Sequence, residues 1–181
     1  MVGKLLYNNR SNQIRGVHIP AGKLVAQQWY ERDPSLLAAE KAAMQHAFPN
    51  FQLDKLDDGN LCWIGDLCFN EFGDNPTVKA VYRSNYPNHL QGCCSIKIYV
   101  DNKYVHKILD YFGKLPLPFR HDTGNSILIN TFSNDELNES EFLSAASVMA
   151  RVVMILSLVE ICMNGELTVD EYEEGLQRFD H

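Results

Sequence analysis

The stretch that decides the fold is DDGNLCWIGDLC, residues 57–68. Asp58-Gly59 is a strong hairpin signal, because glycine accepts the positive φ that a tight hairpin turn requires. After this turn, polar and apolar residues alternate with a period of two, which is typical of a β-strand. Trp63 is the largest side chain of the strand, so we expect it to be buried between a sheet and a helix. Gly65 indicates a bend or the close approach of another group to the backbone.

Strand signals continue on both sides of this hairpin. Residues 51–53 precede it, and residues 78–83 and 94–100 follow it, with turn-forming Gly, Asn and Pro residues between them. Short turns between consecutive strands are typical of antiparallel pairing. The sequence therefore predicts a four-stranded antiparallel meander.

One helix is predicted before the meander and two after it. Asp33-Pro34 supplies a cap and a favourable first position for an amphipathic helix over residues 35–47. Residues 142–163 form a long apolar pattern that Gly165 ends. Thr168 and Glu171 then give the capping-box pattern of a last short helix. The fold class predicted is α+β, with the meander between an N-terminal helix and two C-terminal helices.

Composition bounds the function. The 181 residues suit a single domain, residues 1–181, with its core at about 33–165. A net charge of −7 without any run of basic residues disfavours nucleic acid as a partner. The N-terminus lacks the apolar core of a signal peptide. The five cysteines form neither a disulfide framework nor a metal-ligand pattern, so we expect reduced thiols, a cytoplasmic location, and no metal or cofactor.

The apolar stretch 142–163 is long enough to cross a membrane. Arg151 and Glu160 lie inside it, and a charge at bilayer depth is costly. We therefore expect a core helix and no membrane association. A helix that is apolar nearly all round is either buried or shared with a partner subunit, so a homodimer through residues 142–163 is also predicted.

The order of these features resembles the ubiquitin-conjugating enzyme fold, and in particular its divergent bacterial members. The resemblance covers about residues 35–165. Its markers are Trp63 and Gly65 on the second strand and Tyr86-Pro87 between the third and fourth strands. It implies a UBC-like fold and, after the fourth strand, an active-site segment that begins at a histidine, here His121.

The chemistry that the resemblance implies is missing. Family members carry a ubiquitin-like protein as a thioester, which requires a thiolate nucleophile. Its cysteine belongs a few residues after His121, where this chain has residues 126–129, Ser-Ile-Leu-Ile. No cysteine occurs between Cys94 and Cys162. We expect no catalytic residue here, but a degenerate groove in which His121 holds the loop and Asn125 is a weak candidate for oxyanion contact. The groove would be lined by three apolar residues, Ile127, Leu128 and Ile129.

The function predicted is therefore that of a non-catalytic adaptor or scaffold in a bacterial ubiquitin-like conjugation pathway, some of which serve defence against phage. Its partners would be a ubiquitin-like protein, an activating enzyme or an active conjugating enzyme. Two alternatives stay open. One is an active enzyme whose thioester cysteine has moved to Cys93, Cys94 or Cys162. The other is an unrelated α+β chaperone or structural subunit.

Overall fold

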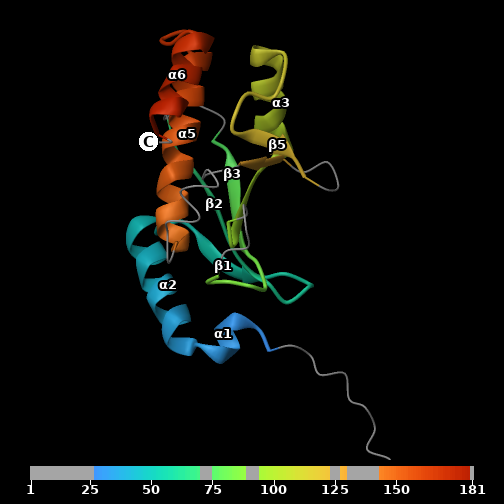
Figure 1. The fold of residues 1–181 in the computed structure, drawn as a ribbon, viewed down its shortest axis with the longest axis vertical. Coiled ribbons are helices and arrows are strands. Elements are labelled where there is room, and N and C mark those ends of the chain that lie inside the picture. Colours follow the sequence, from blue (N-terminus) through green and yellow to red (C-terminus); the bar gives the residue numbers. More distant parts are fainter. Residues whose placement is uncertain (1–26, 70–74, 89–93, 123–126, 130–142, 180–181) are drawn as a thin grey trace, which may run out of the picture.

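The computed structural model describes residues 27–69, 75–88, 94–122, 127–129 and 143–179 (Figure 1). Its elements, in chain order, are α1 (Trp29–Arg32), α2 (Pro34–Ala47), β1 (Gln52–Lys55), β2 (Leu61–Asp66), β3 (Thr77–Tyr82), β4 (Ile96–Val100), α3 (Asn102–Phe112), β5 (Phe119–His121), β6 (Ile127–Ile129), α5 (Ala145–Met163) and α6 (Val169–Phe179). The fold is α+β, as the sequence predicts.

The sheet is larger than the predicted meander. It has six strands in the order β1-β2-β3-β4-β6-β5, and every neighbouring pair is antiparallel. Strands β1 to β4 follow one another as expected. The two added strands, β5 and β6, are only three residues long each, too short for a period-two pattern to be visible in the sequence. Helix α3, between β4 and β5, was not predicted either.

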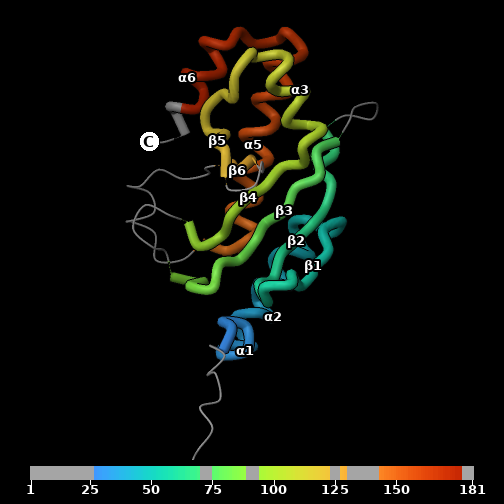
Figure 2. Tube along the Cα trace, turned by 90° about the vertical axis from the view of Figure 1, so that its right-hand side faces the viewer, coloured from blue at the N-terminus to red at the C-terminus, as the bar shows by residue number. Residues whose placement is uncertain are grey.

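The register of the strands separates two faces of the sheet. One row of paired residues faces the helices, and all but one of them are buried: Leu53, Trp63, Ala80, Ile98, Ile129 and Phe119. The predicted burial of Trp63 is confirmed, with 2% of its surface exposed. The neighbouring row points to the other side, since successive side chains alternate along a strand. Figure 2 looks onto this second side, with α2 and α5 behind the strands.

Helix α5 closes the core on the covered face. It packs against α2, α6 and α3, and its inner side is buried along its whole length. By length and composition α5 could cross a membrane, but 44% of its most apolar stretch is buried inside the fold. Burial of this inner side accounts for part of the apolar character of α5, whereas Met154 and Ile161 of the same helix are exposed. The structure is compatible with a soluble protein.

Local signals set the ends of several elements where the sequence predicts them. Asp33 caps α2 by accepting a hydrogen bond from the Leu36 amide at 2.9 Å. Gly59 takes a positive φ of 86° in the β1–β2 turn. The last helix has its capping box, in which the Glu171 amide donates to Thr168 Oγ1 at 3.2 Å and the Thr168 amide donates to Glu171 Oε2 at 2.8 Å.

A buried polar chain joins the two helices of the covered face to the sheet. Glu40 of α2 is 2% exposed, and its Oε2 accepts hydrogen bonds from the Tyr82 hydroxyl at 2.6 Å and the Ala145 amide at 2.9 Å. The Tyr82 hydroxyl in turn accepts one from Trp63 Nε1 at 3.0 Å. Because Ala145 is the first residue of α5, the carboxylate also lies at the positive end of that helix. This arrangement fixes α2, β2, β3 and α5 relative to one another.

Candidate functional site

The open face of the sheet carries a polar row at the centre of the molecule. Its members, paired across the six strands, are Gln52, Ile64, Lys79, Tyr99, Leu128 and Arg120. Lys79 and Arg120 are exposed, and Tyr99 is half-buried. Two of the six residues are therefore cations that reach solvent, on a protein whose net charge is negative.

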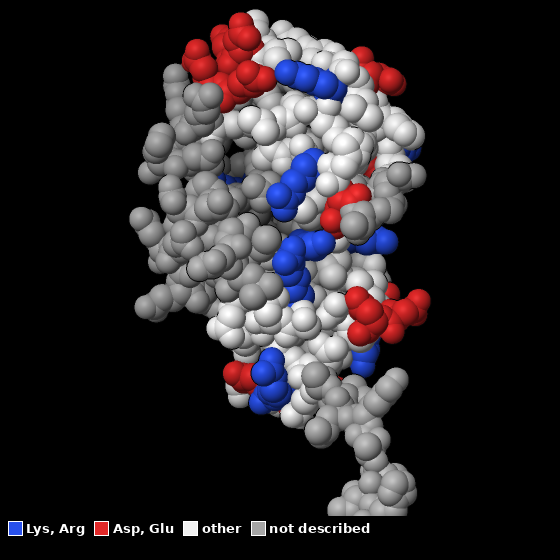
Figure 3. All heavy atoms as spheres, turned by 45° about the vertical axis from the view of Figure 1, so that its right-hand side comes forward, with Lys and Arg blue, Asp and Glu red and all other residues white. Residues whose placement is uncertain are grey.

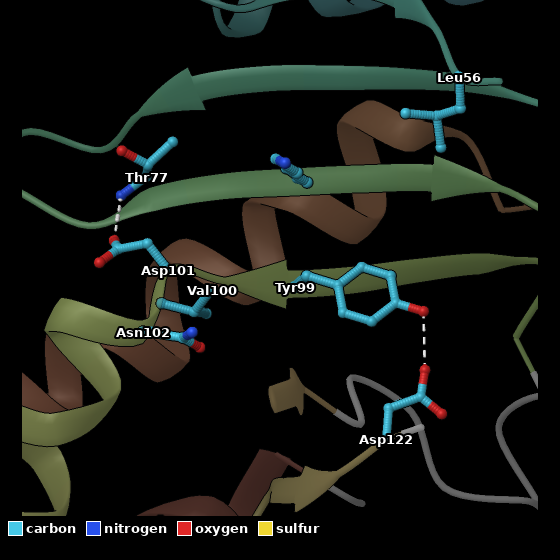
Figure 4. A pocket seen from close by; sticks show the side chains of 8 residues that line it. Leu56, Thr77, Tyr99, Val100, Asp101, Asn102 and Asp122 are labelled. Atoms are coloured by element: carbon cyan, nitrogen blue, oxygen red, sulfur yellow. Dashed lines mark hydrogen bonds between the residues drawn. The ribbon is translucent and has the colours of Figure 1, made fainter. Parts of the chain in front are cut away.

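A pocket of about 390 Å³ opens on this face. It lies where β3 and β4 meet the start of α3 and the end of β5, as Figure 4 shows. Its lining comprises Leu56, Thr77, Lys79, Tyr99, Val100, Asp101, Asn102 and Asp122. The pocket thus combines two apolar side chains with two carboxylates, one cation and one phenol.

The Asp122 carboxylate anchors one wall of the pocket. Its Oδ2 accepts hydrogen bonds from Lys97 Nζ at 2.8 Å and from the Tyr99 hydroxyl at 2.7 Å. The hydrogen bond to Asp122 raises the pKa of Lys97, and burial raises the pKa of Tyr99. The Lys97 ammonium group and the Tyr99 phenol therefore keep their protons around neutral pH. This pairing joins the end of β5 to β4 and fixes the Tyr99 ring at the pocket edge.

The Asp101 carboxylate anchors the opposite wall. Its Oδ1 caps α3 by accepting a hydrogen bond from the Tyr104 amide at 3.0 Å, and its Oδ2 accepts one from the Thr77 amide at 2.7 Å (Figure 4). Both oxygens of Asp101 therefore have partners within the fold. Lys79 differs, because within the described part of the chain its ammonium group makes no hydrogen bond or ion pair.

The lining consists largely of side chains that can form hydrogen bonds or ion pairs. The described lining contains no cysteine, serine or histidine, and no group of three metal-ligating side chains occurs among the described residues. The pocket offers one free ammonium group, one fixed aromatic ring and hydrogen-bonding carboxylates. Such a set pairs with a partner's polar group and holds its orientation.

The predicted degenerate groove is not where the sequence places it. Ile127, Leu128 and Ile129 form β6, in the interior of the sheet, and all three are buried. Ile127 and Ile129 face the helices and Leu128 belongs to the polar row, so they cannot line one groove together. The physical reason is strand pairing, which sends alternate side chains to opposite faces.

The loop role predicted for His121 belongs to its neighbour. His121 ends β5 with an exposed side chain that makes no hydrogen bond to the described residues, whereas Asp122 accepts hydrogen bonds from Lys97 and Tyr99. Asn125 lies outside the described residues. Asp122 directly follows His121 in the sequence, but the sequence alone does not show that it lies near Tyr99. Their proximity depends on the pairing of β4 with β6.

The residues that carry the sequence resemblance all contribute to packing or to the backbone path of the fold. Trp63 and Tyr86 are buried, and the Tyr86 ring packs against the rings of Trp29 and Tyr82. Gly65 is overlain by the ring of Phe51, since a Cβ built at position 65 would lie 2.6 Å from Phe51 Cδ2. The close approach expected at Gly65 is therefore confirmed. The Tyr86–Pro87 peptide bond is cis.

The thiols that the structure describes differ in access. Cys162 is buried, and burial raises its pKa, as it does for Cys62. Cys94 is half-buried, Cys68 is exposed, and Cys93 lies outside the described residues. A buried thiol with a raised pKa is a poor nucleophile at neutral pH, so Cys162 is ill suited to carry a thioester.

Sequence reasoning missed Lys79, Tyr99 and Asp101 as site residues. Each belongs to an ordinary strand or strand end, and no local motif marks them. The period-two pattern of residues 78–83 could have placed Lys79 on the open face, but its position beside Tyr99 depends on the strand register.

Comparisons with protein-family models, with curated proteins and with solved structures found no match to this chain.

Proposed function

We propose that this protein is a non-catalytic binding module, an adaptor or scaffold, and that it engages a protein partner through the pocket on the open face of its sheet. The observation that carries the proposal is Lys79, an ammonium group without a partner in the described structure, placed between walls that are fixed by their own hydrogen bonds. The complementary group on the partner is a carboxylate.

Rigidity of the walls supports this assignment. Asp101 is held by two backbone amides, and Tyr99 is held by Asp122, so neither side chain needs to reorder when a partner arrives. Pre-organised groups lower the entropy lost on binding. Lys79 is the exception, and its long side chain can adapt to the partner.

The biological setting comes from the sequence resemblance. We propose that the fold is UBC-like and that the partner is a ubiquitin-like protein, its activating enzyme or an active conjugating enzyme of the bacterial cytoplasm. Support comes from the four consecutive antiparallel strands that follow α2 and from the buried positions of Trp63 and Tyr86. The buried state of Cys162 weighs against the alternative in which that thiol carries a thioester.

The test mixes the chain with a bacterial activating enzyme, its ubiquitin-like protein and ATP, and separates the products on a non-reducing gel. We expect no thiol-sensitive adduct. Binding to each protein is then measured by isothermal titration for the native chain, for Lys79→Glu and for Lys41→Glu. Lys41 is a matched control, because it is exposed on α2, on the covered side of the sheet.

We expect Lys79→Glu to weaken binding about tenfold or more, because a like charge then faces the partner's carboxylate, and Lys41→Glu to leave it unchanged. An adduct that disappears when Cys93, Cys94 or Cys162 is replaced by serine would overturn the non-catalytic proposal. Equal affinities for the two variants would remove the pocket from the proposal. Absence of both adduct and binding would favour an unrelated chaperone or structural subunit.

A further inference from the structure

One end of the molecule displays apolar side chains that the fold leaves uncovered. Five large apolar side chains are exposed in the described part of the chain, and four of them belong to α3, α5, α6 and the loop before β5. They are Tyr111, Leu117, Ile161 and Val169, and we call them the end surface. Figures 1 and 2 both place α3 and α6 at the same end of the molecule.

Contacts between these elements hold the end surface together. The Tyr111 hydroxyl donates to the Cys162 carbonyl at 2.7 Å, which joins α3 to the end of α5. The Tyr172 hydroxyl of α6 donates to the Leu117 carbonyl, and the rings of Tyr172 and Phe112 lie 5.5 Å apart. The apolar side chains are therefore presented by elements that are bonded to one another.

Leu117 is the most exposed of them, at 72%. It stands between Pro116 and Pro118, whose rings restrict the backbone on both sides. The Phe119 amide donates to the Pro116 carbonyl at 2.9 Å and closes a turn around Leu117. A leucine held outward by a fixed backbone has the properties of an interface anchor, because little entropy is lost when it enters a partner's pocket.

The rim of the end surface is acidic. Residues 110–117 and 161–176 contain six carboxylates and a single lysine, Lys114. Figure 3 shows acidic side chains gathered at the end of the molecule where Figure 1 draws α6. A second copy of this chain would bring a like-charged rim against this one, so a symmetric dimer through the end surface is disfavoured.

We propose that the end surface binds a basic amphipathic helix of another protein, with Leu117 inserted among its apolar side chains and its Lys and Arg residues facing the acidic rim. This surface is separate from the pocket on the sheet face and does not depend on the function proposed for that pocket. An adaptor with both surfaces can hold two partners at once.

The probe is a fluorescent peptide of about 18 residues built from leucine at i, i+3, i+4 and i+7 and lysine elsewhere. Its binding to the full chain is followed by fluorescence polarisation. We expect Leu117→Ser to weaken binding about tenfold or more. We expect Met154→Ser, which removes the fifth exposed apolar side chain from the middle of α5, to leave it unchanged. Because Leu117 is mostly exposed, the melting temperature of Leu117→Ser should match that of the native chain.

Charge is tested on both partners. The double variant Glu166→Gln with Asp170→Asn should bind the lysine peptide more weakly and with a smaller dependence on salt. A peptide with glutamate in place of lysine should not bind. Equal losses for Leu117→Ser and Met154→Ser, or equal binding of the two peptides, would overturn the proposal. So would self-association of the native chain, seen by light scattering and abolished by Leu117→Ser, since the occupant would then be a second copy.

Discussion

The hydroxyl of Tyr82 occupies the middle of the buried polar chain, between Trp63 Nε1 and the Glu40 carboxylate. Tyr82→Phe removes this hydroxyl without opening a large cavity. We expect a loss of about 1–3 kcal/mol in the free energy of unfolding, because the Trp63 donor is left without an acceptor. Urea denaturation measures it. In a double-mutant cycle with Glu40→Gln the two losses should not add, since both residues belong to one network.

Gly65 is tested by filling the space that Phe51 takes. The ring of Phe51 leaves no room for a Cβ at position 65, and Phe51 is itself buried. Gly65→Ala should therefore lower the free energy of unfolding by about 1–3 kcal/mol. In a Phe51→Leu background the additional loss from Gly65→Ala should be smaller, because the shorter side chain gives way. Equal losses in the two backgrounds would contradict the clash.

At the scale of single residues, the sequence could indicate a close approach at Gly65 and burial of Trp63, because both depend on an alternating strand with a distinctive residue in it. It could not indicate Glu40. A glutamate within an amphipathic helix is ordinarily solvent-exposed. Its burial depends on the crossing of α2 with the start of α5, more than a hundred residues later in the chain.

Among the helices, α6 offers a test by pH. The amide and hydroxyl of Thr168 donate to the Glu171 carboxylate and lower its pKa below the ordinary value. A carboxylate whose pKa is lowered on folding adds stability above its unfolded pKa of about 4.3, and this contribution is lost as the pH falls through the folded pKa. Glu171→Gln should therefore be less stable than the native chain at neutral pH, and the difference should shrink in acid.

The measurement is the midpoint of urea denaturation at several pH values. Glu166→Gln is the control, because it removes an exposed carboxylate from the same region without removing a helix cap. A difference between Glu171→Gln and the native chain that stays constant from neutral to acid pH would show that the capping box adds no charge-dependent stability.

Helices α2 and α6 were predictable from their caps, whereas the short strands β5 and β6 and the capped helix α3 were not. Asp33 and Thr168 mark the starts of α2 and α6, and Gly59 marks the turn between β1 and β2. These residue types are typical of such positions. The missed helix, α3, has its own cap in Asp101 and its own end in Gly113, with a φ of 68°. Its apolar residues at positions 104, 105 and 108 follow a helical spacing, but this pattern is much shorter than that of residues 142–163. The short hairpin of β5 and β6 forms only because β4 offers an edge to β6.

For the molecule as a whole, the common core predicts unfolding in one step. Trp29, Trp63 and Tyr172 come from α1, β2 and α6, and all three belong to the same buried cluster. Tryptophan fluorescence, which reports on the N-terminal part of that cluster, and far-ultraviolet circular dichroism, which reports on all helices and strands, should therefore give coincident urea transitions. A fluorescence transition that precedes the loss of helix would show that α5 and α6 form a separate unit.

The position of α5 late in the chain has a consequence for synthesis on the ribosome. Strands β1 to β4 leave the ribosome complete once residue 100 has emerged, yet the helix that covers their apolar face begins only at Ala145. Because translation adds about 5–20 residues per second, the nascent sheet spends seconds with that face open to water. A transcript cut short before the codon for Ala145 would release this sheet with α2 but permanently without α5 on its apolar face. Such truncated chains should be the ones that chaperones retain and proteases remove.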